Sequence, residues 1–282
     1  MKKKIKINKK FIQKNLFVKN FIEPILFVIG IYILGCIPIF VLSSFFPFFL
    51  DKEYLFIFIF FVIALNGWAH RRWKQENIWE KLGFAKIRDQ FFTNNFRKEL
   101  FKSFFIIFFW CLLLLFGGYI RFETSIYFNF LFDILFTAIF VGVAEELLFR
   151  VWLFEELNQF FSRNKSIIVQ SIIFALVHSY NFDESFFINF LMKFGLFLLG
   201  IYLNLLRINH YSNIFPSIAF HGGIVGFIFL AKSFLQVNKH YPSLIYGSQY
   251  DNFINPISGF IGIFTLLCLN FHQIKLLNQR NS

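Results

Sequence analysis

A few ionisable side chains inside apolar stretches are the residues of this sequence best suited to chemistry. Two adjacent carboxylates, Glu145 and Glu146, precede Arg150 in the stretch VGVAEELLFR. His178 lies in FALVHSY, and His221 lies in IAFHGG. Ionisable groups are costly inside membrane segments and usually mark a pathway or a site, and carboxylates and imidazoles are common general acids and bases. Together these residues predict acid–base chemistry on a bound substrate.

Helix geometry gives the two glutamates different roles. Glu146 and Arg150 stand four residues apart on one helix face, so they can form a charge-assisted pair. Glu145 is rotated by about 100° from Glu146. Its carboxylate therefore lacks an intrahelical partner and is free to accept a proton from water. Spacing alone is equally consistent with a solvated acid–base pair at a helix end.

Each histidine, taken singly, is also consistent with a hydrogen-bonded side chain in an apolar helix and nothing more. His221 differs in being followed by Gly222 and Gly223, which permit close backbone approach. The interpretation as a site therefore depends on the histidines and the glutamates occurring together.

The elements that carry these residues are expected to lie in lipid. The chain is 57% hydrophobic and 16% charged, with a mean hydropathy of +0.60, which is too apolar for a soluble domain of 282 residues. Apolar stretches suited to a hydrocarbon core of about 30 Å start near Pro24, Tyr54, Phe101, Ile126, Ser166, Phe187, Asn213 and Pro256. We predict an all-α, polytopic membrane helical bundle with about eight transmembrane helices.

The distribution of basic residues sets the predicted topology. A net charge of +12 would suit a nucleic-acid partner, but eight alternating spans place 23 of the 28 Lys and Arg residues on one side. This asymmetry follows the positive-inside rule and predicts that both termini are cytoplasmic, with no nucleic-acid partner. A re-entrant segment at 54–69 would break the alternation and misplace most of that charge.

We predict one membrane domain, residues 21–274, with the motif-bearing core at roughly 126–234. A basic cytoplasmic segment, 1–20, precedes the domain, and a short tail, 275–282, follows it. The three cysteines lie in apolar stretches without CxxC spacing, which argues against a disulfide framework. The expected location is a bacterial-type inner or plasma membrane, or a thylakoid-like membrane.

Three motifs together resemble those of the CPBP family of intramembrane proteases, which covers CAAX proteases and bacteriocin-processing proteins and is also called Abi. EELLFR at 145–150 resembles the EExxxR signature, FALVH at 174–178 resembles FxxxH, and the segment at His221 resembles the third motif. Their order and their placement on successive late helices match, over about the second half of the chain. WEKLGF at 79–84 and the pair Asn255–Pro256 add to the resemblance.

The resemblance implies an intramembrane endopeptidase that cleaves a membrane-associated or lipid-tethered protein or peptide. Glu145 would act as general base on a water molecule, assisted by His178, and His221 would stabilise the oxyanion. Glu146 and Arg150 would hold the site together. The lipid bilayer and the substrate are the partners expected.

The sequence departs from the family at Val225, where the third motif commonly has an asparagine four residues after the histidine. Loss of one oxyanion donor costs about a hundredfold to a thousandfold in rate. The backbone at Gly222 and Gly223 is one conceivable substitute.

The side chains of the predicted site are compatible both with a bound zinc ion and with a site that has no metal. Glu145, His178 and His221 could bind a zinc ion with a position left for water, but nothing in the chain resembles HExxH. A base-activated water needs no metal and uses the same residues, so zinc is the lesser alternative.

Two other functional classes stay open. Val225 favours a non-catalytic membrane scaffold or an immunity-type protein of the same fold. The ionisable residues Asp133, Glu145, Glu146 and Lys193 and the histidines inside apolar stretches would also suit a proton-linked transporter. We leave Asp133 and Lys193 out of the site because each can reach the interface from near a helix end.

Overall fold

The computed structural model describes residues 22–43, 53–84, 90–122, 130–178, 180, 184–237, 241–250 and 253–281. The predicted basic segment 1–20 and the predicted start of a span at Ile126 lie outside these residues. The chain divides into two compact units, 1–78 and 79–282, and each is described by itself. The domain boundaries predicted from the sequence stay predictions.

The first unit contains a pair of apolar helices, α2 (Glu23–Ser43) and α3 (Glu53–Trp73), that run antiparallel. The rings of Phe27 and Trp68 lie 4.2 Å apart between their centroids. Arg72 donates a hydrogen bond of 3.2 Å to Glu23, which ties the end of α3 to the start of α2.

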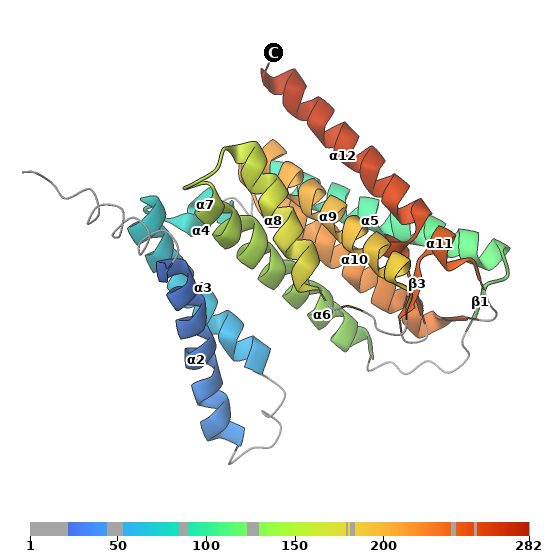
Figure 1. The fold of residues 1–282 in the computed structure, drawn as a ribbon, viewed down its shortest axis with the longest axis horizontal. Helices are drawn as coiled ribbons and strands as arrows, with labels where there is room; N and C mark the ends of the chain where they lie inside the picture. Colours follow the sequence, from blue (N-terminus) through green and yellow to red (C-terminus); the bar gives the residue numbers. More distant parts are fainter. Residues whose placement is uncertain are drawn as a thin grey trace, which may run out of the picture. The chain divides into compact units, whose positions relative to one another are not determined.

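The second unit is a helical bundle that carries all three motifs (Figure 1). Its elements are α4 (Ile78–Lys81), α5 (Gln90–Phe116), β1 (Ile120–Phe122), α6 (Phe130–Glu145), the π-helical segment η4 (Glu146–Leu153), α7 (Phe154–Leu157), α8 (Arg163–Val177), α9 (Phe186–Asn209), α10 (Phe215–Phe234), β2 (Leu235–Val237), α11 (Ser243–Tyr246), β3 (Ser248–Tyr250), β4 (Phe253–Asn255), the 3₁₀ turn η5 (Pro256–Ser258) and α12 (Phe260–Asn281).

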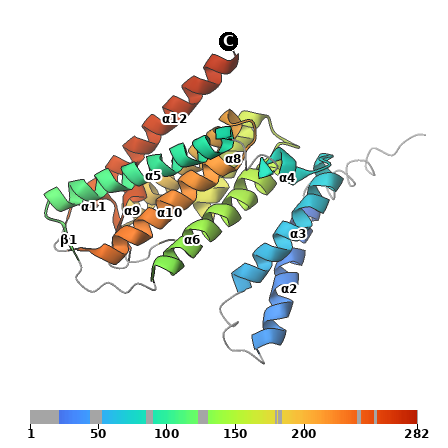
Figure 2. The ribbon, with the colours of Figure 1, turned by 180° about the vertical axis from the view of Figure 1, so that it is seen from behind.

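Helix α10 lies at the centre of this bundle. It packs against α5, α6 and α9, and α9 in turn packs against α8 and α12; Figure 2 shows α5, α10 and α6 side by side. Phe174, Tyr202 and Phe220 are fully buried in the core between these helices. The two elements that carry Glu145 and His221 are therefore direct neighbours.

The segment WEKLGF fixes the start of α10. Ile214 donates a backbone hydrogen bond of 3.2 Å to the carbonyl of Leu82, and the rings of Phe84 and Phe215 are 4.8 Å apart. Gly83 has φ = +93°, a backbone conformation that favours glycine. This segment thus anchors the helix that carries His221.

Two short antiparallel ribbons were not predicted. β1 pairs with β2 through Arg121 opposite Gln236, and β3 pairs with β4 through Gln249 opposite Ile254. Each strand has three residues, which is too short to show the alternation by which strands are recognised in a sequence.

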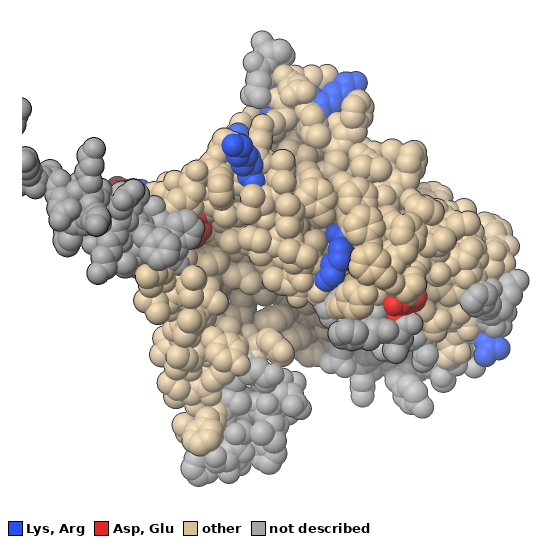
Figure 3. Space-filling view, viewed as in Figure 1, with Lys and Arg blue, Asp and Glu red and all other residues tan. Residues whose placement is uncertain are grey.

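Among the described residues, five helices are long and apolar enough to cross a membrane, and they correspond to α3, α5, α9, α10 and α12. The face in Figure 3 shows few charged side chains, and large apolar side chains such as Phe105, Phe109 and Phe264 point outward. These features support an all-α membrane bundle.

Helix boundaries differ from the prediction at two places. α5 begins at Gln90, well before the predicted start at Phe101, because its first turns are polar and carry no hydropathy signal. α12 continues to Asn281, so the described part of the predicted tail is helical. The predicted count of eight spans exceeds the five that meet the criteria of length and apolarity.

Candidate active site

The two glutamates lie where an α-helix passes into a π-helix. α6 ends at Glu145, and η4 begins at Glu146 without a break in the helical backbone. We predicted one regular α-helix here. π-helical turns are rare and frequently occur at functional sites, because they turn side chains away from their α-helical directions.

Small residues bring this helix against α10. A Cβ atom on Gly142 would lie 2.9 Å from the Cα atom of Gly222, and one on Gly226 would lie 2.8 Å from the side chain of Ala138. The two backbones are therefore in direct contact over two helical turns, the arrangement that small residues allow between membrane helices. The close approach predicted at Gly222 is confirmed.

This contact buries a cluster formed by Glu146, Arg150 and His221. Glu146 and Arg150 have no exposed side-chain surface, and Nη1 of Arg150 is 3.2 Å from Oε1 of Glu146. Nδ1 of His221 donates to the same Oε1 at 2.8 Å. The guanidinium group of Arg150 also lies 4.0 Å from the centre of the Phe174 ring, a favourable cation–π geometry. The alternative of a solvated pair at a helix end is therefore wrong.

Glu145 faces the two histidines. Its Oε2 atom is 3.7 Å from Nε2 of His178 and 3.8 Å from Nε2 of His221. These distances are too long for direct hydrogen bonds, but one water molecule can bridge groups at this separation. This oxygen is buried and has no hydrogen-bond partner among the described residues.

In both histidines, the acceptor next to Nδ1 determines which ring nitrogen carries the hydrogen. Nδ1 of His178 lies 2.6 Å from the carbonyl oxygen of Phe174, which can only accept, so Nδ1 carries the hydrogen. Nδ1 of His221 donates to Glu146 in the same way. In the neutral form of each ring, the lone pair of Nε2 therefore points towards Glu145.

His178 caps the C-terminal end of α8, where the backbone turns to an extended conformation. Nζ of Lys193, on α9, donates to the backbone carbonyl of His178. We left Lys193 out of the site, yet it fixes the residue that carries the second motif. Its position inside an apolar stretch was the available signal. The side chain of Asp133 lies outside the described residues.

The three facing groups open on a cavity of about 280 Å³. Apart from them, the cavity is lined mainly by apolar side chains of α9, α10 and the β4–η5 corner. Val225 contributes to this lining, as does Asn255. We noted Asn255 only as part of a familiar pair, because its position over the cavity depends on chain folding.

The predicted backbone substitute for the missing asparagine is wrong. Gly222 and Gly223 lie inside α10 and are buried against α6 and α5. N–H groups in a helix interior bond to the carbonyl four residues earlier. They are thus not available to a substrate in the cavity.

The end of η4 is held by a second buried charge. Arg207, on α9, donates to the carbonyl of Arg150 and to Oε1 of Glu155, the latter at 2.9 Å. Burial raises the pKa of Glu155, but Arg207 and Lys81 lower it more, so the net shift is downward. Glu155 thus stays ionised and keeps Arg207 in place.

The site offers nitrogen and oxygen donors of the kinds that zinc accepts. Within the described part of the chain, however, no three His, Cys, Asp or Glu side chains gather closely enough to hold a metal ion. Glu145, His178 and His221 therefore do not form a ready-made metal centre as they stand.

One family model matches the part of the chain that carries the three motifs. Residues 127–227 match the family model described as type II CAAX prenyl endopeptidase Rce1-like. The searches of curated proteins and of solved structures found no match. The matched segment contains Glu145, His178 and His221, and it extends from the start of α6 to the middle of α10. The resemblance of this chain to the CPBP family of intramembrane CAAX-type endopeptidases is therefore confirmed over the segment that carries its motifs.

Proposed function

We propose that this protein is an intramembrane endopeptidase that hydrolyses a peptide bond in a membrane-associated or lipid-tethered protein or peptide. The observation that carries this proposal is the unpartnered carboxylate oxygen of Glu145, which faces Nε2 of both His178 and His221 over an apolar cavity. A shielded carboxylate of this kind is suited to accept a proton from water and to return it.

In the proposed reaction, a water molecule lies between Glu145 and His178. Glu145 takes one proton as the water oxygen forms a bond with the carbonyl carbon of the substrate. The electron pair of the C=O double bond moves to oxygen and gives a tetrahedral oxyanion. The intermediate then collapses, the C–N bond breaks, and the proton passes from Glu145 to the leaving amine.

His221 and the buried pair have a supporting role in this proposal. For His221 to stabilise the oxyanion through Nε2, the ring must be protonated on both nitrogens. The carboxylate of Glu146 accepts from Nδ1 and holds the ring with Nε2 towards Glu145. Arg150, in contact with Glu146 and Phe174, keeps this carboxylate in position.

We further propose that all eight predicted helices span the membrane with both termini in the cytoplasm. The positive-inside distribution supports this topology, although α6 and α8 have only 16 and 15 residues and only the stretch Glu23–Pro38 of α2 counts as an apolar helix, a short one. A substrate would need to unfold locally, because a helical backbone hides its carbonyl groups in hydrogen bonds. No nucleic-acid partner is proposed.

The test is cleavage of a membrane-peptide library by the purified full-length protein, read by mass spectrometry. We expect cleavage by the wild type and none by Glu145→Gln, because the amide cannot accept the proton. His221→Ala should also be inactive. All variants are first checked for folding by thermal denaturation in detergent. Equal cleavage by the wild type and Glu145→Gln would contradict the proposed role of Glu145 as the base.

A chelator arm separates the metal-free mechanism from the zinc alternative. We propose a metal-free, base-activated water, so activity should survive dialysis against 1,10-phenanthroline. Activity lost on dialysis and restored by Zn²⁺, but not by Mg²⁺, would instead assign Glu145, His178 and His221 as zinc ligands.

The second candidate is a non-catalytic scaffold of the same fold. The observation in its favour is Val225, which gives the cavity an apolar wall one helical turn from His221. A folded wild type that binds a membrane peptide without cutting it, with the same affinity as Glu145→Gln, would support the scaffold.

A further inference from the structure

The arrangement of the two histidines leaves the site short of a hydrogen-bond donor. Both rings use their Nδ1 hydrogen on groups behind them, the carbonyl of Phe174 and the carboxylate of Glu146. In the neutral state neither Nε2 carries a hydrogen. His221 can therefore donate to the oxyanion that forms when water attacks a peptide carbonyl only while its ring is protonated on both nitrogens, and a second donor in the cavity would add to that stabilisation.

Two other side chains that line the described cavity carry N–H donors, Asn255 and Lys232. Lys232 stands eleven residues after His221 on α10, which places its backbone roughly 16 Å further along the helix axis. Its long side chain can also turn towards the membrane interface. Asn255 comes from a different element, the corner between β4 and η5, and lines the same cavity.

The Asn255 side chain is already oriented. Its Oδ1 atom accepts a hydrogen bond of 3.1 Å from the backbone N–H of Ile257, an Asx turn that fixes the amide plane. Both hydrogens on Nδ2 are thereby left for another acceptor. Among the described residues, Nδ2 makes no hydrogen bond.

The corner that presents Asn255 is rigid. The hydroxyl of Ser258 donates to the carbonyl of Asn255 at 3.0 Å and accepts from the backbone N–H of Ser248 at 2.7 Å. The carbonyl of Ile257 lies directly against Gly195 of α9, where no side chain could fit. A donor that is fixed before the reaction stabilises charge without reorganising.

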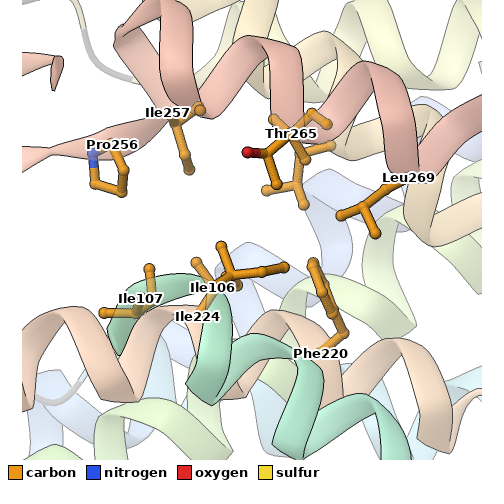
Figure 4. A pocket seen from close by; sticks show the side chains of 11 residues that line it. Ile106, Ile107, Phe220, Ile224, Pro256, Ile257, Thr265 and Leu269 are labelled. Atoms are coloured by element: carbon orange, nitrogen blue, oxygen red, sulfur yellow. The ribbon is translucent and has the colours of Figure 1, made fainter. Parts of the chain in front are cut away.

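Apolar side chains of the β4–η5 corner pack towards α5 and α10 and set the distance between the corner and α10. In Figure 4, Pro256 and Ile257 face Ile107 and Ile224 across a gap, which has a volume of only about 40 Å³. Ile224 is adjacent in sequence to Val225 and lines both this gap and the main cavity. The corner therefore packs close to the part of α10 where the motif asparagine is missing.

We propose that Nδ2 of Asn255 donates a hydrogen bond to the tetrahedral oxyanion and so replaces the donor that Val225 cannot supply. This inference rests on the proposed endopeptidase function. The bond between the water oxygen and the carbonyl carbon forms with Glu145 as base, the carbonyl electron pair becomes the oxyanion, and Asn255 stabilises that oxyanion. Asn255 is then a catalytic residue supplied by the corner between β4 and η5.

The experiment compares Asn255→Asp with Asn255→Ala on the library peptide that the wild type cleaves fastest. Aspartate keeps the oxygen that accepts from Ile257, so it preserves the turn but removes the N–H donor. We expect kcat to fall about a hundredfold to a thousandfold in Asn255→Asp, with KM changed little. Asn278→Asp, the same replacement at an exposed position of α12, should leave kcat unchanged.

A rescue variant distinguishes a catalytic from a structural role. Val225→Asn restores a donor one turn from His221, so adding it to Asn255→Ala should recover at least tenfold of the lost kcat. A merely structural loss at the corner would not be recovered from α10. Wild-type kcat in Asn255→Asp, or a loss of kcat in Lys232→Ala instead, overturns the inference while the endopeptidase function stands. A folded wild type that cleaves no peptide would contradict both the role of Asn255 and the proposed endopeptidase function.

Discussion

At the scale of single residues, two neighbouring carboxylates differ because they meet different surroundings. Glu146 is enclosed with Arg150 and His221 and has no exposed surface. Glu145 is partly exposed, about 28% of its side chain, and opens on the cavity. The pairing of Glu146 with Arg150 agrees with the helical spacing, and we propose that Glu146 holds charges in place while Glu145 exchanges a proton.

Replacing Arg150 should show how strongly the buried pair is coupled. Arg150→Met leaves the charge of Glu146 enclosed without its main partner, so we expect the free energy of unfolding to fall by about 3 to 5 kcal/mol. The measurement is reversible unfolding in mixed detergent micelles. Arg163→Met, at an exposed position, should cost far less.

The double variant Glu146→Gln with Arg150→Met tests whether the unpaired charge of Glu146 causes the loss of stability. Removing both charges should restore part of the stability lost in Arg150→Met, because no unpaired charge stays buried. Additive losses would mean that the two side chains do not stabilise each other.

At the scale of elements, the site depends on how closely two helices approach. His221 reaches Glu146 because Gly142 and Gly222 let α6 and α10 touch backbone to backbone. The other supports act at helix ends: Lys193 holds the end of α8 at His178, and Arg207 holds η4. Loops contribute to the site mainly at the β4–η5 corner.

A single methyl group at the helix contact should separate the catalytic groups. A Cβ atom at position 142 would lie 2.9 Å from the backbone of Gly222, so Gly142→Ala must push α6 and α10 apart. We expect peptide cleavage to fall at least tenfold and the thermal midpoint to drop.

The matched control is Gly30→Ala in α2, where the added methyl group meets nothing within 4 Å. It should leave both cleavage and the thermal midpoint unchanged. Wild-type activity in Gly142→Ala would show that the distance between the helices does not set the geometry of the site.

At the scale of the whole molecule, the apolar surface and the charge asymmetry determine how the chain sits in a bilayer. Five helices meet the criteria for a span within the described residues, whereas the apolar stretches predict eight, a count with which the charge distribution agrees. Short helices such as α8, with 15 residues, can still reach across in a bundle that thins the bilayer locally. The number of spans therefore decides on which side each terminus lies.

Reporter fusions test this topology directly. A green fluorescent protein fused after Ser282 should fluoresce, since we predict a cytoplasmic C-terminus, and alkaline phosphatase at the same place should be inactive. The opposite pattern is expected for fusions after Phe122, which follows α5. Identical patterns at both positions would mean that an odd number of the intervening segments does not cross.

Composition and motif spacing were enough to predict an all-α membrane protein and to select the candidate residues of its site. Long apolar stretches identify membrane helices because lipid excludes unpaired backbone groups. The predicted starts of α2, α3, α8 and α9 lie within three residues of the observed starts. Three motifs were enough to select Glu145, His178 and His221, since ionisable groups inside apolar helices are rarely accidental.

The solvation of the acid–base pair, the directions of the histidines and the lining of the cavity depend on how distant segments pack. Burial of Glu146 and Arg150 depends on α8 and α10 packing over them, which local spacing does not contain. Asn255 lies thirty positions after Val225 in the chain, yet the two line one cavity. Such contacts arise when small residues let distant helices and a buried corner close together, and no periodicity in one segment encodes that approach.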